Sequence, residues 1–272
     1  YLLDIDIDLS SCSDELLSGL FSFFWYGGLP STEKNTTEDQ TYFSGYVYQG
    51  GELEDTKASQ GENILSSYKG NLDWSAIRTK YFLASFIPED PTAVISASMG
   101  ASYNGRETYD MSIAVPSNSL FRAFVYLGPL EYSRINQIGK DLDLVMNFGW
   151  FFIIPISKGV LWLLKNMHFY IPNYGFVLVL FSILIKIVVY PLTKKSYQST
   201  RAMQSLQPEI AGLKEKFKTN PQKLNQATMA LYKKRGVNPL GGCLPMLLQM
   251  PLLFALFTVF RSTIELRGEP FI

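Results

Sequence analysis

Three polar side chains are spaced four residues apart within a stretch that is otherwise apolar. Ser182, Lys186 and Tyr190 lie in the nineteen residues from Tyr174 to Leu192, where Lys186 carries the only charge. A helix places side chains four residues apart on one face. At about 1.5 Å per residue, such a helix spans roughly the 30 Å hydrocarbon core of a bilayer. The spacing predicts a transmembrane helix at 173–193 with a polar face centred on one cation.

The charge of Lys186 limits where its side chain can lie. A charged group at the bilayer centre costs about 2.5–3.5 kcal/mol on insertion scales, so it usually faces a partner, a bundle interior or a water-filled cavity. We favour a polar cavity, in which the ammonium attracts negatively charged groups. The alternative is that the lysine snorkels toward the headgroups near Lys194, about 12 Å farther along the helix.

The charges are sorted along the chain, although its 24 basic and 24 acidic residues cancel. Residues 1–147 hold 20 acidic and 9 basic residues, whereas residues 194–236 hold 10 basic and 2 acidic ones. Apolar segments lie between and after these regions. This pattern predicts a membrane protein with a domain on each side of the bilayer. By the positive-inside rule, the basic region is cytoplasmic and residues 1–147 lie on the opposite side.

A second apolar segment, at 240–260, has no formally charged residue. It predicts a second transmembrane helix at 239–263, and residues 264–272 then begin a segment on the side of residues 1–147. Gln249 is a polar side chain within this helix. It either hydrogen-bonds a neighbouring helix or lines the same cavity as Lys186. The candidate binding groove therefore comprises Ser182, Lys186, Tyr190 and Gln249.

The basic region 194–238 follows Pro191, which is predicted to mark the exit from the bilayer. Apolar residues recur there at helical spacing in two sets, separated by Thr219-Asn220-Pro221 and ended by Gly236. The pattern predicts a basic antiparallel helical hairpin. Orientation in the membrane is the simpler role for its charges, but ten basic residues exceed what orientation needs. The candidate docking residues for ribosomes or targeting factors are Lys214, Lys216, Lys218, Lys233, Lys234 and Arg235.

Residues 1–147 show mainly strand patterns. Residues 1–10 alternate apolar side chains with Asp4, Asp6 and Asp8, which predicts a half-buried strand with its acids in solvent. A calcium loop is the alternative, but the glycine and distal glutamate of an EF-hand loop do not follow. Several short strands with turns between them favour a β-sandwich. Further strands are predicted at 41–48, 93–99, 108–115 and 120–127, with a hairpin turn at Asn104-Gly105.

Two helices are predicted within this domain. The first has Asp73 as its N-cap and Trp74, Ile77 and Tyr81 on one face. The second covers 131–141.

The segment 148–172 is rich in aromatic residues and is predicted to be an interfacial amphipathic helix, with a short kinked transmembrane segment as the alternative.

Cys12 and Cys243 fall in regions that the bilayer would separate, so we do not expect them to pair. We expect the chain to be part of a longer protein.

Several motifs resemble those of YidC-type insertases of the YidC/Oxa/Alb family. WYGG at 25–28, LDWSAIRTKYFLASFIP at 72–88 and LDLVMNFGW at 142–150 resemble the periplasmic domain and its entry into the membrane. YPLTKKSY at 190–197 and ALYKKRGVNPLGGCLPMLLQMP at 230–251 are more specific. The resemblance covers nearly the whole chain.

The resemblance implies an α+β membrane protein of the bacterial inner membrane. It has a periplasmic antiparallel β-sandwich, an interfacial helix and transmembrane helices with a cytoplasmic helical hairpin. Those helices enclose a hydrophilic groove whose positive residue attracts acidic client tails. The implied partners are nascent membrane proteins, the Sec translocon with its accessory subunits, the ribosome and membrane lipids. Neither a cofactor nor a metal is implied, and the oligomeric state is left open.

This chain departs from the family pattern at the groove. The positive residue is usually arginine, whereas the matching residue here is Lys186, which keeps the charge and loses the bidentate fork. The family also has more membrane helices than the two predicted here, which alone would not close a groove.

Two other functions compete with insertion. An enzyme would use the periplasmic domain, which is similar to sugar mutarotases, and would need a positioned acid and base, often histidine. The single histidine, His168, lies outside that domain, so we expect no catalytic residues. A transporter or channel subunit with a sugar-binding-like domain is the other alternative.

Overall fold

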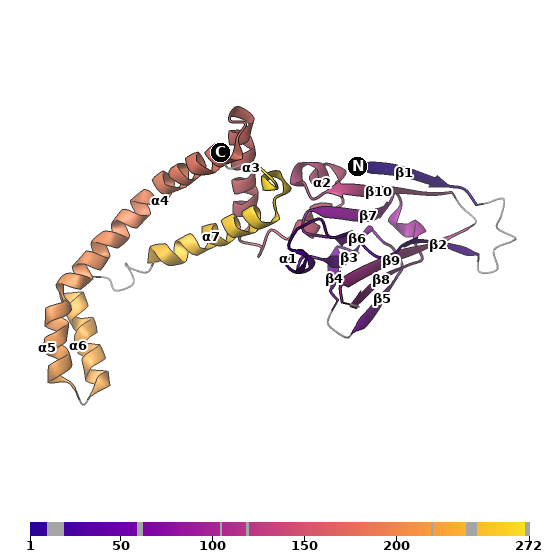
Figure 1. The fold of residues 1–272 in the computed structure, drawn as a ribbon. Helices are drawn as coiled ribbons and strands as arrows, with labels where there is room; N and C mark the ends of the chain where they lie inside the picture. Colours follow the sequence, from indigo (N-terminus) through magenta and orange to yellow (C-terminus); the bar gives the residue numbers. More distant parts are fainter. Residues whose placement is uncertain are drawn as a thin grey trace. The chain divides into compact units, whose positions relative to one another are not determined.

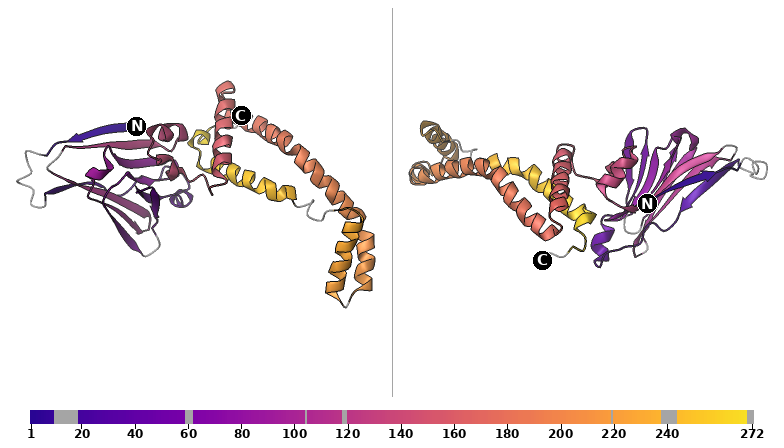
Figure 2. Two further views of the ribbon diagram at one scale, coloured as in Figure 1. Left: turned by 180° about the vertical axis from the view of Figure 1, so that it is seen from behind. Right: turned by 90° about the horizontal axis from the view of Figure 1, so that it is seen from above.

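The computed structural model describes residues 1–9, 19–58, 62–103, 105–117, 120–218, 220–237 and 244–269. The chain forms two compact units. The first holds Tyr1–Asn147 together with Ser262–Arg267, and the second runs from Phe148 to Arg261. The strands gather in the first unit and the long helices in the second (Figure 1 and Figure 2). Cys12 and Cys243 lie outside the described residues, so their predicted separation stays a prediction.

The first unit contains two antiparallel sheets. The six-stranded sheet has the order β1-β10-β7-β6-β3-β4, and the four-stranded sheet has the order β2-β9-β8-β5 (Figure 1). The strands of the larger sheet are β1 (Leu2–Ile7), β10 (Phe121–Pro129), β7 (Phe82–Pro88), β6 (Trp74–Arg78), β3 (Ser44–Gln49) and β4 (Glu52–Thr56). Those of the smaller sheet are β2 (Leu20–Trp25), β9 (Glu107–Pro116), β8 (Ser96–Tyr103) and β5 (Asn63–Lys69).

One apolar core joins the two sheets. Strand β9 contributes every second residue to this core, because successive side chains point to opposite faces of a strand. The sheets approach closely where β3 faces β8. A Cβ atom on Gly45 would lie 2.3 Å from the Met99 Sδ atom, so any larger residue there would displace the Met99 side chain. The predicted β-sandwich is confirmed.

Five of the ten strands in the described residues were predicted from the sequence. The runs at 1–10, 41–48, 108–115 and 120–127 overlap β1, β3, β9 and β10, whereas β2, β4, β5 and β7 were not predicted. Asp4 and Asp6 are exposed on β1, as expected. The strand predicted at 93–99 begins only at Ser96, because the 3₁₀-helix η2 (Pro91–Ala93) precedes it. Tyr103 pairs with Glu107 in the predicted β8–β9 hairpin, and Asn104 lies outside the described residues.

The helix predicted after Asp73 is wrong. Residues Trp74–Arg78 form strand β6, which lies between β7 and β3 and is buried along its whole length. A strand buried on both faces reads as a continuous apolar run, so spacing alone does not separate it from a buried helix. The helix predicted at 131–141 is present as α2 (Tyr132–Ile138) and is followed by the 3₁₀-helix η3 (Leu142–Met146). A short helix that was not predicted, α1 (Thr36–Gln40), precedes β3.

The second unit consists of helices. Asn173 caps the longest of them, because its side chain accepts a hydrogen bond from the Phe176 N–H at 3.2 Å. That helix continues through Pro191 as far as Ser205, so Pro191 does not end it. The helices are α3 (Ile154–Tyr170), α4 (Tyr174–Ser205), α5 (Gln207–Lys216), α6 (Pro221–Lys234) and α7 (Leu244–Ser262), whose last residue belongs to the first unit.

The stretch Tyr174–Pro191 of α4 is long and apolar enough to cross a membrane, with a mean hydropathy of 2.1. Among the described residues it is the one candidate span. The span predicted at 239–263 corresponds to α7 from Leu244 onward, and its first residues lie outside the description. That segment remains a predicted span.

Candidate functional site

The polar face of α4 carries the candidate groove residues. Because α4 is continuous from Tyr174 to Ser205, Ser182, Lys186 and Tyr190 lie one above the other on it, and all three are exposed within this unit. The Ser182 hydroxyl donates to the Leu178 carbonyl at 2.8 Å, so its proton is used within the helix. Lys186 carries the only formal charge on the stretch Tyr174–Pro191.

The residues beside Lys186 show what surrounds this charge on the helix surface. Exposed large apolar side chains, including Ile183, Ile187 and Val188, occupy the positions around it. A single cation among exposed apolar groups fits a helix that faces lipid on one side and a polar path on the other.

Gln249 does not lie at the level of Lys186. Helices α4 and α7 meet where the Phe181 and Phe260 rings pack edge to face, with centroids 6.3 Å apart. From that contact, Lys186 lies roughly 8 Å along α4 and Gln249 roughly 16 Å along α7. Both side chains are exposed, and no hydrogen bond joins them in the described structure. A groove that contains both residues would therefore extend over more than one helical turn.

The basic region folds into α5 and α6, which lie side by side in Figure 2. The Asn220 side chain accepts from the Lys223 N–H at 3.0 Å and caps α6, and Gly236 follows its end with φ +64°. Thr219, the first residue of the predicted turn, lies outside the described residues. The cytoplasmic placement of this hairpin stays a prediction.

The six candidate docking residues of the hairpin differ in their surroundings. Arg235 pairs with Glu209, Nη2 to Oε1, at 2.7 Å, and this pair joins the end of α6 to the start of α5. The charge of Arg235 is therefore partly neutralised, and the ion pair links the two helices of the hairpin. The other five side chains are exposed on the two helices and remain candidates for docking a partner: Lys214, Lys216, Lys218, Lys233 and Lys234.

Exposed aromatic side chains lie just before α3, in its middle and at its C-terminal end. One face of α3 is buried, and the Ser157 hydroxyl there donates to the Phe148 carbonyl at 3.1 Å. His168 stacks on Tyr174 with ring centroids 3.8 Å apart, where α3 passes into α4. An apolar face with aromatic ends is typical of an interfacial helix, which this segment is still predicted to be. The exposed aromatic residues are Trp150, Phe151, Phe152, Trp162, Phe169 and Tyr170.

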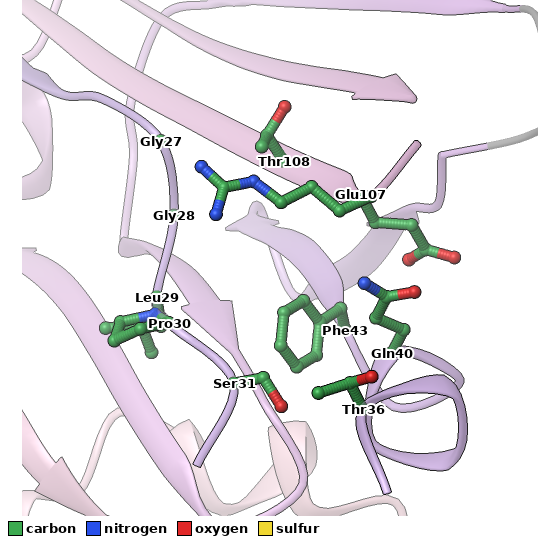
Figure 3. Close-up of a pocket in the computed structure, with 11 residues that line it drawn as sticks. Gly27, Gly28, Leu29, Pro30, Ser31, Thr36, Gln40, Phe43, Glu107 and Thr108 are labelled. Atoms are coloured by element: carbon green, nitrogen blue, oxygen red, sulfur yellow. The ribbon is translucent and has the colours of Figure 1, made fainter. Parts of the chain in front are cut away.

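The sandwich contains a cavity of about 380 Å³. Figure 3 shows Gly27 to Pro30 along one side and Phe43 and Gln40 on the other. Among the described residues that line this cavity, Glu107 is the one carboxylate and none is a histidine. Glu107 lies 3.0 Å from the Tyr109 hydroxyl, and burial raises the pKa of Tyr109. The described residues also contain no group of three or more His, Cys, Asp or Glu that could hold a metal ion.

Two residues with structural roles were not recognised from the sequence. Arg78 is buried in β6 and donates through Nη1 to the Val145 carbonyl, and burial lowers its pKa. Trp74 donates through Nε1 to the Lys140 carbonyl at 2.8 Å. Both therefore hold the segment that leaves the sandwich. A tryptophan and an arginine in one short apolar strand were the available signal, but Trp74 was interpreted as part of one face of a helix, and Arg78 was given no role.

Together, these features define a class of protein. A β-sandwich is joined to a helical part that contains one apolar helix with a central cation and a basic helical hairpin, which describes a membrane protein with a sizeable extramembrane domain. Residues 1–163 match the family model of the YidC periplasmic domain, and residues 166–272 match that of the 60Kd inner membrane protein. The chain belongs to the YidC family of membrane protein insertases.

Curated relatives support this assignment. The membrane protein insertase YidC of Chlorobium luteolum is 38% identical over 285 residues and covers all of this chain. That of Prosthecochloris aestuarii is also 38% identical, over 281 residues and again the whole chain. This chain covers 48% of each of these two relatives, so it spans about half of their length.

A solved structure also matches, entitled "Active YidC insertase crystal structure with the first transmembrane domain resolved". It is 21% identical, with a TM-score of 0.38, over 82% of this chain and 63% of the other.

Proposed function

We propose that this protein is a membrane protein insertase and chaperone that admits hydrophilic client tails to a positively charged groove and releases client helices into lipid. The observation that carries the proposal is Lys186, the only charge in the apolar stretch of α4, exposed on one face with Ser182 and Tyr190. The relatives that bear the insertase name support it, whereas nothing specific favours a transporter or channel subunit.

The proposed mechanism follows from the cost of moving polar groups through hydrocarbon. Unsatisfied backbone groups and charges oppose passage of a client tail across the bilayer. A hydrated groove shortens that path, and the Lys186 ammonium attracts acidic groups of the tail where the dielectric constant is low. The apolar client helix then gains free energy by leaving the groove for lipid. This role requires charge and no covalent chemistry, so we propose that the protein is not an enzyme.

The proposed setting is the bacterial inner membrane, with spans at 173–193 and 239–263. Residues 1–147 are placed in the periplasm, 148–172 at the membrane interface and 194–238 in the cytoplasm. The proposed partners are nascent membrane proteins, the Sec translocon, the ribosome and lipids. The net charges of the two extramembrane regions support this orientation.

If Lys186 faces a hydrated groove, water should reach position 186. In full-length protein whose native cysteines are replaced by serine, Lys186→Cys should react with a water-soluble thiol reagent added from the cytoplasmic side. Ile187→Cys is the matched control, because Ile187 is 67% exposed in this unit yet projects from a neighbouring face. It should react at least tenfold more slowly. Equal protection of both cysteines would contradict a hydrated groove.

The hairpin predicts salt-dependent binding to ribosomes. Reversal of Lys214, Lys216 and Lys218 to glutamate should weaken binding at least tenfold and lower the slope of log K against log salt by about 2–3. Reversal of three exposed sandwich lysines (Lys34, Lys57 and Lys69) makes the same charge change and should leave binding unaltered. If ribosome affinity stays constant while binding to anionic liposomes falls, the hairpin recognises lipid headgroups instead.

A further inference from the structure

The segment that follows α7 docks on the β-sandwich through one arginine. The Arg267 Nε atom lies 2.7 Å from Glu33 Oε1, and its Nη2 atom donates to the Thr32 carbonyl at 2.9 Å. The guanidinium carbon also lies 5.6 Å and 5.7 Å from the ring centroids of Tyr81 and Phe82. The planar fork and the two aromatic rings together use the features that distinguish arginine from lysine.

The loop that receives Arg267 is itself held in place. The Asp39 side chain is 1% exposed, and its Oδ2 atom accepts from the Ser31 hydroxyl at 2.6 Å and from the Thr32 N–H at 3.3 Å. These contacts fix the backbone that presents Thr32 and Glu33. Hydrogen bonds to a carboxylate are stronger than those between neutral groups. They therefore hold the loop in the conformation that Arg267 contacts.

Lys80 connects the two sides of this surface. Its Nζ atom pairs with Glu38 at 3.0 Å, on the helix next to the loop, and lies 5.2 Å from the centroid of the Tyr81 ring. The loop and the β6–β7 turn therefore form one continuous docking surface, whose members are Thr32, Glu33, Tyr81 and Phe82.

The conformation of the segment Ser262–Arg267 places Arg267 next to the sandwich. Ser262 and Thr263 are 9% and 5% exposed. The 3₁₀-helix η5 (Ile264–Leu266) follows, and the Arg267 N–H donates to the Ile264 carbonyl at 2.9 Å. Burial of the first residues and a tight turn in the next ones leave Arg267 in place to contact the sandwich.

The same part of the sandwich, from Arg78 to Phe82, also contacts the segment that precedes Asn147. The chain leaves the sandwich after Asn147, and Arg78 at the end of β6 holds the Val145 carbonyl just before that point. It returns at Ser262 and is held by Tyr81 and Phe82 at the start of β7. The residues from Arg78 to Phe82 thus contact both Val145 and Arg267, which belong to the same unit as the sandwich.

We propose that Arg267 is a latch that docks the segment Ser262–Arg267 on the sandwich surface formed by Thr32, Glu33, Tyr81 and Phe82. With the latch closed, the sandwich is tethered to α7 as well as to α3. A domain tethered at two points has less freedom than one on a single linker. This inference does not depend on the proposed insertase activity.

Hydrogen exchange in the full-length protein in lipid nanodiscs tests the latch. Arg267→Gln should speed exchange in the peptide 262–269 roughly tenfold, because a charge-assisted contact no longer closes it. Glu33→Gln should do the same, and the double variant should add little more, since both changes break one contact. In the charge-swapped variant, Glu33→Arg with Arg267→Glu, hydrogen exchange of the peptide 262–269 should return most of the way to the original rate.

Arg122→Gln is the matched control. Arg122 also pairs with carboxylates of the sandwich, Asp6 at 3.7 Å and Glu89 at 3.8 Å, but it does not contact the docked segment. Its replacement should leave exchange in 262–269 unchanged, and exchange in β6 and β7 should stay slow in every variant. Unchanged exchange of 262–269 in Arg267→Gln, or equal acceleration by Arg122→Gln, would overturn the proposal.

Discussion

Lys186→Ala is expected to lower the insertion of clients with an acidic translocated tail at least tenfold, whereas Lys186→Arg should retain most insertion. Two unit charges 4 Å apart attract by about 4 kcal/mol at an effective dielectric constant of 20. A tenfold loss needs only about 1.4 kcal/mol, so even a partly hydrated contact suffices. Arginine keeps the charge, and a mechanism that uses charge alone does not need the geometry of either cation.

Insertion of one single-span client into proteoliposomes, with acidic and neutral versions of its tail, measures this effect. The neutral tail should be inserted similarly by the original protein and by Lys186→Ala. Lys194→Ala is the matched control, because it removes an exposed lysine from the same helix outside the apolar stretch. A snorkelling Lys186 predicts that alanine is tolerated with either tail. Equal insertion in all these combinations would rule out the electrostatic mechanism.

Trp74→Ala is expected to destabilise the sandwich by about 3–5 kcal/mol, the usual cost of truncating a buried aromatic side chain. Trp74 is fully buried and stacks on Tyr48, with ring centroids 5.3 Å apart. The substitution leaves a cavity and also leaves the Lys140 carbonyl without the indole N–H that it accepts from. The segment that leaves the sandwich should loosen as a consequence.

Hydrogen exchange of the most protected amides in β6 and β7 measures this loss of stability. Their exchange rates should rise by a factor of at least about 100. Leu65→Ala is the control, because Leu65 is 74% exposed on the edge strand β5 and its truncation should change stability by less than about 0.5 kcal/mol. Similar exchange rates for the two variants would mean that Trp74 does not anchor the core.

Several elements could be predicted from the sequence because their signals are local. The alternation along β9, the asparagine before α6 and the glycine after it each act within a few residues of the chain. The apolar stretch of α4 and its single lysine are local as well, and so is the sorting of charge between residues 1–147 and the basic hairpin. Signals of this kind need no knowledge of which segments pack together.

Other features depended on contacts between distant parts of the chain. Strand β6 was mistaken for a helix because neighbours on both sides bury it, and those neighbours are set by the sheet order. Nothing near Arg267 in the sequence indicates that it pairs with Glu33, which lies 234 residues away. The chemical character of these residues was readable from the sequence. Their partners were decided only by tertiary structure, because burial and ion pairing depend on which surfaces meet when the chain folds.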